Sequence, residues 1–590
     1  MKLNLTLLLI FLTNNMDTVF GRGNCKLEKY ENKVVCTRMG SVYEINEKIS
    51  DLNKMEFKSL TLKGFYAENL DLTKLSVFPR LHQFLTKMST IYKLSSETVT
   101  NEVIQMKQLD LSSSNLKEIL PNTFKNFQEL ETLNVGNNRL SILSNNMFEG
   151  LVNLKNLLLF KNRIKSLPSN LFDDLRSLYM LDLDNNNVKS LDEETFSNLK
   201  NLKYLNVSNN DLSEVPSNIF HFIPQIAELR LEHNNISDIK LDAFKSLNAV
   251  KRLYLSKNPL KTINCDIFIT FAAVEKLYLT YTNIKDLNKN CFNTTNSLYE
   301  LDLSLNYFSN LPNLPKNIKT LIMYGNKIFH LPARIFSKYT QLKELYLQNN
   351  QINEIEFRAF DGLSNLEELY LFGNQLEHLE TGVFKNLHKL KVLSLASNKL
   401  QRIAYELFNL PNLEKLSLLL NKLSKLNDNA LLYIPKLKQL DLSFNEIIEL
   451  PNRLFINLKF LLILKINSNQ INYLQNSCFN GLERLEVMDL SNNAITSVHH
   501  KAFEGLGLVQ FISLRNNKLQ FIDEEVFQGL SNLKTLVLDN NEFSTLPLNQ
   551  FKNAPSLTYI SLDGNFLEDS VLERFYNTYY SYSTFQNSLG

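Results

Sequence analysis

Aromatic side chains recur at a fixed spacing near the middle of the chain. Tyr254 and Tyr278 are 24 residues apart, and so are Tyr346 and Tyr370. A tyrosine offers a large flat contact area and one hydroxyl, and tyrosines are enriched at the energetic centres of interfaces. With their flanking aromatics they form a set, named the tyrosine strip: Tyr254, Tyr278, Tyr281, Tyr324, Tyr346, Tyr370 and Phe372. We interpret this strip as a ligand-binding surface; the alternative is that the rings only pack on one another and cover strand backbone.

Residues that make or break bonds show no matching pattern in this sequence. A catalytic site needs a nucleophile beside a base, paired carboxylates in a cleft, a phosphate-binding loop or metal-ligand spacing. None of these patterns occurs, and the eight histidines are scattered. We therefore expect no catalytic residue, no metal site and no cofactor, and interpret the protein as a binding protein rather than an enzyme.

A leucine-rich pattern surrounds the tyrosines and explains their spacing. One copy reads Leu-x-x-Leu-x-Leu-x-x-Asn-x-Ile and contains Leu345, Leu347, Asn350 and Ile352. Seventeen of the nineteen intervals between successive Asn positions are 24 residues, and the exceptions are 20 and 23. These positions are Ser114, Asn138, Asn162, Asn186, Asn210, Asn234, Asn258, Thr282, Asn306, Asn326, Asn350, Asn374, Asn398, Asn421, Asn445, Asn469, Asn493, Asn517, Asn541 and Asn565. Such registered copies are the signature of a leucine-rich repeat.

Alternation within each repeat predicts how it folds. In the Leu-x-Leu segment, side chains point to opposite faces of a strand, so the leucines enter the core and the residue between them faces outward. The following Asn carries amide donors and an acceptor that can satisfy the backbone of a buried turn. Ser114 and Thr282 keep a hydroxyl at that position, so we expect a weaker ladder there. A Phe ten residues after most of these positions is interpreted as a structural spine between coils.

The repeats together predict the fold class. We expect an α/β-type leucine-rich repeat solenoid of about 20–22 repeats, each contacting only its neighbours. One strand per repeat would build a long parallel sheet on the concave face of a curved horseshoe, because the returning half of each repeat is longer than the strand half. Weaker repeats are expected before the clear ones, around Leu60 to Leu62 and Leu81 to Phe84.

The two ends of the chain differ from the repeats. Residues 1–21 combine Lys2 with a short apolar core, which predicts a secretory signal peptide. We expect residues 22–55 to form an N-terminal cap, residues 56–575 the solenoid and residues 576–590 a Tyr-rich C-terminal tail. The tail either covers the last coil or leaves that end open for a homodimer. No later apolar segment is long enough to span a bilayer, so we expect a secreted protein without membrane insertion.

Five cysteines allow two disulfides and leave one residue over. A bond between Cys25 and Cys36 would staple the N-terminal cap in an oxidising compartment. Cys265 and Cys291 are 26 residues apart, which places them on neighbouring coils and is compatible with a second bond. Cys478 is left over, either as a buried inert thiol or as the site of an intermolecular disulfide in a homodimer.

Three glycosylation sequons lie beyond the predicted signal, and they begin at Asn206, Asn235 and Asn293. Asn206 occupies an outward position of its strand, where a glycan would obstruct the face next to the tyrosine strip. The alternative is that Asn206 stays unmodified. Asn235 and Asn293 fall outside the strand, where glycans are easily tolerated.

Charge is nearly balanced, with 63 basic and 61 acidic residues and a net charge of +2. This balance does not favour nucleic acid or an anionic membrane as a partner. We therefore expect no nucleic-acid ligand, and an extracellular or cell-surface protein or a glycan as the partner.

The repeat length, the Phe step and a Pro six residues after the Asn, as at Pro168 and Pro216, resemble the "typical" extracellular class of leucine-rich repeat proteins. Toll-type receptor ectodomains, chaoptin-like adhesion proteins and secreted insect immune repeat proteins belong to this class, and the resemblance covers about residues 55–575. It implies a secreted protein that recognises protein or glycan ligands through the concave face, in a receptor-type or innate-immune role. The alternatives are a cell-adhesion or matrix protein and the ectodomain of a truncated receptor. The sequence lacks the C-terminal cysteine cluster and signalling domain of Toll-type receptors, which puts signalling by this chain alone in doubt.

Overall fold

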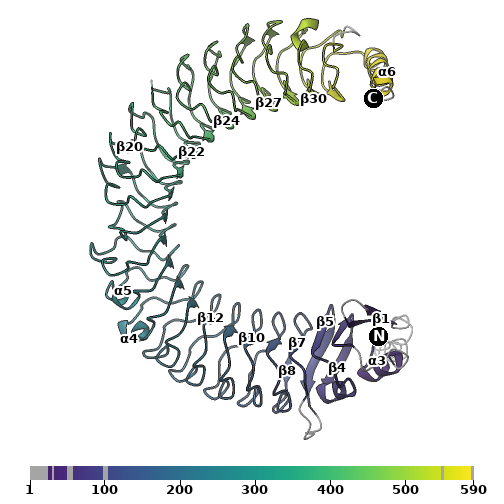
Figure 1. The fold of residues 1–590 in the computed structure, drawn as a ribbon, viewed down its shortest axis with the longest axis vertical. Helices are drawn as coiled ribbons and strands as arrows, with labels where there is room; N and C mark the ends of the chain where they lie inside the picture. Colours follow the sequence, from purple (N-terminus) through teal and green to yellow (C-terminus); the bar gives the residue numbers. More distant parts are fainter. Residues whose placement is uncertain are drawn as a thin grey trace, which may run out of the picture. The chain divides into compact units, whose positions relative to one another are not determined.

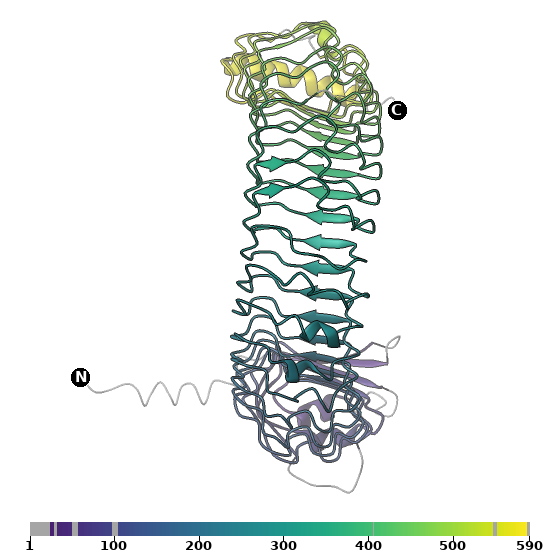
Figure 2. The ribbon, with the colours of Figure 1, turned by 90° about the vertical axis from the view of Figure 1, so that its left-hand side faces the viewer.

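The computed structural model describes residues 24–28, 32–49, 57–96, 104–404, 406–546 and 551–586. The predicted signal peptide, residues 1–21, lies outside the described residues. The chain divides into two compact units, Met1–Leu298 and Tyr299–Gly590. Within each unit the repeats stack as successive rungs, with the strands on the inner side of the curve and the turns on the outer side (Figure 1; Figure 2).

The first unit begins with an antiparallel pair, β1 (Asn24–Glu28) and β2 (Lys33–Thr37). β2 pairs in parallel with β3 (Ser59–Lys63), and every further pairing along this sheet is parallel. The sheet continues through β5 (Gln83–Lys87), β7 (Gln108–Asp110), β9 (Thr132–Asn134), β10 (Asn156–Leu158), β11 (Met180–Asp182), β12 (Tyr204–Asn206), β13 (Glu228–Arg230), β14 (Arg252–Tyr254) and β15 (Lys276–Tyr278). β3 and β5 confirm the weak repeats expected around Leu60 and Leu81.

Shorter elements fill the returning half of the repeats in the first unit. A second sheet consists of β4 (Tyr66–Asp71), β6 (Thr90–Ser95) and β8 (Glu118–Ile119). The helices are α3 (Val42–Ile49), the 3₁₀ helix η2 (Leu72–Val77), α4 (Leu241–Phe244) and α5 (Ile267–Thr270). Ser41 starts α3, because its hydroxyl accepts the Glu44 N–H at 3.1 Å while the Glu44 carboxylate accepts the Gly40 N–H at 2.8 Å.

The second unit repeats the same parallel arrangement. Its main sheet consists of β16 (Glu300–Asp302), β17 (Thr320–Ile322), β19 (Glu344–Tyr346), β21 (Glu368–Tyr370), β22 (Val392–Ser394), β23 (Lys415–Ser417), β24 (Gln439–Asp441), β25 (Ile463–Lys465), β27 (Val487–Asp489), β29 (Phe511–Ser513), β30 (Thr535–Val537) and β31 (Tyr559–Ser561). Two small sheets pair β18 (His330–Leu331) with β20 (Glu354–Ile355) and β26 (Tyr473–Leu474) with β28 (Ser497–Val498). The remaining elements are the 3₁₀ helix η3 (Glu524–Phe527) and α6 (Asp569–Gln586).

A buried ladder of asparagines holds the coils together, as the sequence predicts. The Asn350 amide donates to the carbonyls of Leu347 and Met323, each at 3.0 Å, and its oxygen accepts the Ile328 N–H at 3.1 Å. One carboxamide thus satisfies backbone groups of two successive coils. At Thr282 a hydroxyl donates to the Leu279 carbonyl at 2.8 Å, so the ladder is kept there by a side chain with fewer hydrogen-bonding groups.

A column of phenylalanines fills the space between coils, which confirms the predicted spine. In the first unit the rings of Phe124, Phe148, Phe172 and Phe196 follow one another at centroid distances of 6.2, 6.4 and 6.5 Å. The central leucine of each strand completes the core, as Leu157 and Leu345 do with no exposed surface. Burial of these repeated apolar side chains is the main stabilising contribution to the fold.

The turn just before each ladder residue adopts a left-handed backbone, which the sequence analysis did not anticipate. The φ angle is +51° at Lys161, +52° at Leu420 and +54° at Phe444. Gly325 and Gly373 occupy the same position with φ of +68° and +66°. The position requires this conformation whatever residue stands there, so the glycines fit it without strain and the leucine and phenylalanine do not.

The described part of the C-terminal segment forms a helix that crosses residue 576, the expected boundary between the solenoid and the Tyr-rich tail. α6 begins at Asp569, inside the last repeat, and continues through Gln586 (Figure 1). Phe575 of this helix is 2% exposed and its ring lies 5.7 Å from that of Phe551. Among the described residues, no helix combines the length and apolarity needed to cross a membrane.

Candidate ligand-binding face

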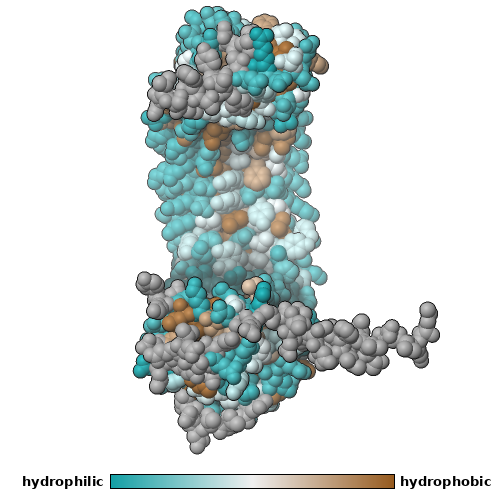
Figure 3. Space-filling view, turned by 90° about the vertical axis from the view of Figure 1, so that its right-hand side faces the viewer, coloured by the Kyte–Doolittle hydropathy of each residue, from teal (hydrophilic) through white to brown (hydrophobic). Residues whose placement is uncertain are grey.

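The strands of the main sheet turn one side toward the core and the other toward solvent. In β19, Leu345 is fully buried, whereas Glu344 and Tyr346 beside it are partly exposed. We name the outward side chains of these strands the strand face. Paired strands align equivalent residues of successive repeats, so the strand face consists of columns of side chains. Neutral and apolar residues gather along its middle, between more hydrophilic edges (Figure 3).

In the first unit, three neighbouring strands carry a stack of one arginine and two tyrosines. Tyr254 on β14 and Tyr278 on β15 are parallel, with ring centroids 4.5 Å apart and an interplanar angle of 7°. The guanidinium of Arg230, on β13, lies 4.5 Å from the Tyr254 ring centroid. Cation–aromatic contact and ring stacking therefore fix these side chains before any ligand arrives.

Ion pairs hold Arg230 in place at the edge of this stack. Its guanidinium lies 2.7 Å from a carboxylate oxygen of Glu232, and Arg252 lies 2.7 Å from Glu228. Burial opposes the charge on Arg230, but the hydrogen bond and charge of Glu232 outweigh it and raise the pKa of the guanidinium. Burial also raises the pKa of Asp182 nearby, more than its hydrogen bond from the Asp184 backbone lowers it. The second carboxylate oxygen of Glu232 is buried and has no hydrogen-bond partner within the described structure.

In the second unit, Tyr346 on β19 and Tyr370 on β21 form an equivalent pair. Their ring centroids are 4.9 Å apart and the interplanar angle is 6°. Their hydroxyls donate to carboxylates of their own strands, to Glu344 at 3.3 Å and to Glu368 at 2.9 Å. Burial, followed by the hydrogen bond to Glu368, raises the pKa of Tyr370 to about 12. Burial likewise raises the pKa of Tyr346, with the charges of both glutamates adding to it.

The flanking residues of the tyrosine strip are placed differently from the two pairs. Tyr281 occupies a left-handed turn with φ of +56° and is 58% exposed. Tyr324 is partly exposed, and burial together with the charge of Asp302 raises its pKa. Phe372 is partly exposed beside the Tyr370 strand. Tyr254, Tyr278 and Tyr281 belong to the first unit and the other strip residues to the second, so each unit presents its own part of the strip.

A depression lies on the strand face of the second unit, over β21 to β25. It has a volume of about 370 Å³. Its lining includes Tyr370, Val392, Lys415, Asp441 and Lys465. Of these, only Tyr370 was selected from the sequence.

Arg230 and Lys465 were not predicted from the sequence, because outward positions were read for aromatic residues alone. Arg230 stands at the same position of its repeat as Tyr254, and Lys465 at the same position as Tyr370. Glu228 and Lys415 belong to the neighbouring outward column, two residues earlier in their repeats. Reading all outward columns in register for charge as well as aromaticity would have found these residues.

The predicted glycosylation sequons differ in accessibility. Asn206 is 6% exposed, and its side-chain oxygen accepts the N–H of Ser208, which is 2% exposed. Asn235 and Asn293 are exposed outside the strands. Glycan attachment at Asn235 and Asn293 stays a prediction, and the burial of Asn206 favours the alternative in which that residue is unmodified.

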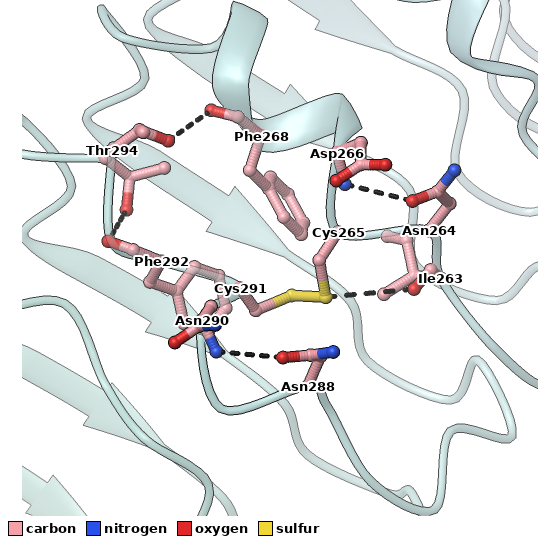
Figure 4. The surroundings of a disulfide bond; sticks show 11 residues. Ile263, Asn264, Cys265, Asp266, Phe268, Asn288, Asn290, Cys291, Phe292 and Thr294 are labelled. Carbon is pink, nitrogen blue, oxygen red and sulfur yellow. Dashed lines mark hydrogen bonds between the residues drawn. A yellow bond between two sulfur atoms is a disulfide. The ribbon is translucent and has the colours of Figure 1, made fainter.

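Both anticipated cysteine pairs are disulfide-bonded, and the fifth cysteine is buried. Cys25 faces Cys36 across β1 and β2, with an S–S distance of 2.02 Å. Cys265 and Cys291 are joined at 2.05 Å between two neighbouring coils (Figure 4). Cys478 is a free thiol with no exposed surface, and burial raises its pKa to about 12. This placement favours the inert thiol over the alternative of an intermolecular disulfide.

No metal-binding cluster was expected from the sequence. Among the described residues, no three His, Cys, Asp or Glu side chains are arranged to hold a metal ion. The contacts described on the strand face are stacking, hydrogen bonding and charge pairing.

These features define a class of protein, a parallel-strand solenoid whose coils are joined by an asparagine ladder and whose outward strand residues are free for contacts. The model of the family described as leucine rich repeat matches residues 104–164, 153–212, 176–236, 224–284, 316–376, 373–419, 460–519 and 509–567, which together exceed half of the chain. The chain therefore belongs to the leucine-rich repeat family, and the predicted fold class is confirmed. None of the curated protein sequences matches it.

Several solved structures share this fold. A chain of the TLR13–ssRNA13 complex is 20% identical, with a TM-score of 0.58 over 93% of this chain and 97% of the other. A chain of the Toll–Spatzle complex of Drosophila is 18% identical, with a TM-score of 0.63 over 91% and 69%. A chain of the mouse RP105/MD-1 complex is 24% identical, with a TM-score of 0.58 over 94% of each chain. At these identities the similarity establishes the fold alone.

Proposed function

We propose that this chain is a non-catalytic extracellular recognition protein that binds a protein partner through its strand face. The observation that carries this proposal is the pair of tyrosine stacks, Tyr254 with Tyr278 and Tyr346 with Tyr370. Each stack is already ordered and only partly buried, so a partner could cover its rings with little further loss of side-chain entropy. Rigid tyrosines of this kind supply much of the binding energy in many interfaces.

Three features support an extracellular location. The first 21 residues have the pattern of a secretory signal, and two sequons fall on exposed residues, Asn235 and Asn293. The disulfides Cys25–Cys36 and Cys265–Cys291 suit an oxidising compartment. We therefore propose that the protein is secreted and glycosylated.

The structural neighbours favour a protein ligand in an immune or receptor-type role. Two of them come from complexes with proteins, Toll with Spatzle and RP105 with MD-1. A third comes from a complex with single-stranded RNA, so the exclusion of nucleic acid drawn from charge balance has no support from the comparisons. A protein ligand remains our choice because the two stacks are aromatic and hydroxyl-bearing, whereas Glu344 and Glu368 beside the second stack would repel phosphates.

Affinity capture with matched variants tests the proposal. The secreted full chain is immobilised and used to capture partners from extracellular fluid and membrane extracts, which mass spectrometry identifies. Two double variants remove one stack each, Tyr254→Ser with Tyr278→Ser and Tyr346→Ser with Tyr370→Ser. We expect at least one of them to weaken a captured protein about 30-fold, the effect of losing a single hot-spot interaction of about 2 kcal/mol.

The control removes two exposed tyrosines that belong to neither stack. Tyr179 is 53% exposed just before β11, and Tyr473 is 38% exposed on β26 of the small outer sheet. The variant Tyr179→Ser with Tyr473→Ser should capture the same partner as the wild type. Equal capture by the wild type and both stack variants, all with wild-type melting curves, would refute the role of the stacks, and preferential capture of RNA would refute the choice of a protein ligand.

A further inference from the structure

The depression over β21 to β25 combines features that the tyrosine stacks lack. Its rim carries two lysines, Lys415 on β23 and Lys465 on β25, and both side chains are exposed. Val392 and Ile463 stand on the same outward column as Lys415, on β22 and β25. The Tyr370 ring lies at one end of the lining. Two positive charges therefore border a depression with a partly apolar lining and a volume of about 370 Å³.

The two lysines differ from other lysines close to them in having no ion-pair partner. Lys391 lies 2.6 Å from Glu367, and Lys438 lies 2.9 Å from Glu414. Within the described parts of the chain, Lys415 and Lys465 have no carboxylate within the 4.0 Å limit of an ion pair. Each unpaired lysine can accept a carboxylate from a ligand without first breaking an existing ion pair.

The charge pattern around the depression restricts the ligand. Asp441 on β24 and Asp489 on β27 stand in register on either side of Lys465, and Glu368 lies at the Tyr370 end. Both aspartates accept a backbone N–H of their own turn, from Ser443 and Ser491. A polyanion with evenly spaced charges would meet these carboxylates as well as the lysines, which costs binding energy. A peptide avoids this, because it can place single carboxylates at the lysines and an apolar side chain between them. The lysines stand two strands apart, about 10 Å across the sheet, a span that a few extended residues cover.

We propose that this depression binds an acidic peptide segment of the protein partner, in which carboxylate side chains flank an apolar one. The carboxylates pair with Lys415 and Lys465, and the apolar side chain lies against Val392 and Ile463. This assignment rests on the proposed function, because it concerns the same strand face and shares Tyr370 with the second stack. It adds a charge requirement that stacking on tyrosines does not impose.

Two capped peptides test the charge requirement directly on the full secreted chain. The acidic probe is N-acetylated and C-amidated Gly-Asp-Phe-Glu-Phe-Asp-Gly, and its matched partner Gly-Asn-Phe-Gln-Phe-Asn-Gly replaces each carboxylate by an amide. Binding is measured by saturation-transfer NMR and calorimetry. We expect the acidic probe to bind about tenfold more tightly than the amide probe, the effect of charge-assisted contacts of about 1.4 kcal/mol in total. The preference should decrease as salt is raised.

Two lysine variants show where the preference arises. Lys415→Gln with Lys465→Gln should abolish the preference for the acidic probe. Lys391→Gln with Lys438→Gln removes two ion-paired lysines outside the lining of the depression and should preserve it. A photoreactive group on the acidic probe should label the segment 392–465, with labelling lost in the first variant.

Three results would overturn the assignment. They are no preference for the acidic probe, a preference that survives Lys415→Gln with Lys465→Gln, and tighter lysine-dependent binding of single-stranded RNA or a sulfated oligosaccharide than of the peptide. The capture experiment separates this assignment from the proposed function. A partner lost by the tyrosine variants but retained by the variant of Lys415 and Lys465 would leave the proposed function standing and refute the acidic segment.

Discussion

Replacing Asn350 by alanine should open the solenoid locally and lower its stability. The Asn350 amide makes three hydrogen bonds of 3.0 to 3.1 Å, to the carbonyls of Leu347 and Met323 and from the N–H of Ile328. The residue is 7% exposed, so water cannot readily replace the lost side chain. Asn350→Ala therefore leaves the Ile328 N–H without its acceptor. Each carbonyl loses one of two donors, because Leu347 also accepts from Asn374 and Met323 also accepts from Asn326.

The magnitude follows from the number of groups left unpaired. The unsatisfied Ile328 N–H costs about 1–3 kcal/mol and each carbonyl loses one of its two hydrogen bonds, so we expect a total loss of about 3 kcal/mol. Asn350→Ser keeps one hydroxyl, as Ser114 does in the first unit, and should lose about half as much. The expected order of stability is wild type, then Asn350→Ser, then Asn350→Ala.

Hydrogen exchange and denaturant unfolding together measure this effect. Because each coil contacts only its neighbours, increased exchange should concentrate in residues 323–350. The Ile328 amide, whose acceptor disappears, should be among the groups that exchange faster. Asn349→Gly is the control, since Asn349 already has φ of +54° and a glycine fits that backbone.

Two outcomes would refute the role of the ladder. The first is a free energy of unfolding of Asn350→Ala within about 0.5 kcal/mol of the wild type, the usual range for a surface substitution. Alternatively, exchange in residues 323–350 could be unchanged while stability falls. The first result would mean that the turn satisfies its backbone groups without the amide, and the second that the side chain acts elsewhere.

Three further outcomes are expected. Removing the disulfide by Cys265→Ala with Cys291→Ala should lower the free energy of unfolding by about 3.5 kcal/mol for a closed loop of this length, and an unchanged denaturation midpoint would contradict it. Glycopeptide mass spectrometry of protein from a secretory host should find a glycan on Asn235 and none on Asn206, so a glycan on Asn206 would contradict its burial. Because burial raises the pKa of Tyr370 from 10.0 to about 12, stability should be present below pH 10 and fall as pH rises toward 12. Tyr370→Phe should reduce this fall, and an identical pH profile for the variant would show that Tyr370 does not cause it.

Contacts that recur in every repeat were predictable, because the same residue types occupy the same positions in each copy. Asn350 is one of a column of asparagines, and its predicted role in satisfying the turn is confirmed by three hydrogen bonds to backbone groups. The Phe spine and the early strands at β3 and β5 followed from the same registered pattern. Periodicity averages over many copies, so single exceptions such as Thr282 do not obscure it.

Two features could not be predicted from the repeat pattern. α6 begins at Asp569, inside the last repeat, and no periodic signal predicted a helix there. The left-handed turn before each ladder residue was not predicted, because the position holds residues as different as Leu420, Phe444 and glycine. The packing of the coil determines the backbone conformation of this turn, whichever residue occupies it. The conformational preference of the residue therefore did not predict the left-handed turn.

The candidate site was partly predictable for a related reason. Pairing of strands in register places Tyr254 beside Tyr278 and Tyr346 beside Tyr370, so the two stacks follow from spacing alone. The contact of Arg230 with the Tyr254 ring and the lack of an ion-pair partner for Lys465 in the described structure do not follow. They depend on side-chain conformations and on which of several nearby carboxylates each cation contacts, and a sequence pattern carries no information about that choice.

The separation between core and strand face explains why binding can be tested here without unfolding the protein. Truncating a buried strand residue such as Leu345 would cost about 2–5 kcal/mol, because its side chain has no exposed surface and leaves a cavity. Removing the stack of Tyr346 and Tyr370 costs the pair interaction, about 0.5–1.5 kcal/mol, together with part of their apolar burial and the hydrogen bonds of their hydroxyls to glutamates of their own strands. Lys415 and Lys465 have no ion pair in the described structure to lose. A solenoid can therefore vary its outward columns while the core is kept, and loss of a partner by these variants reports on recognition rather than on folding.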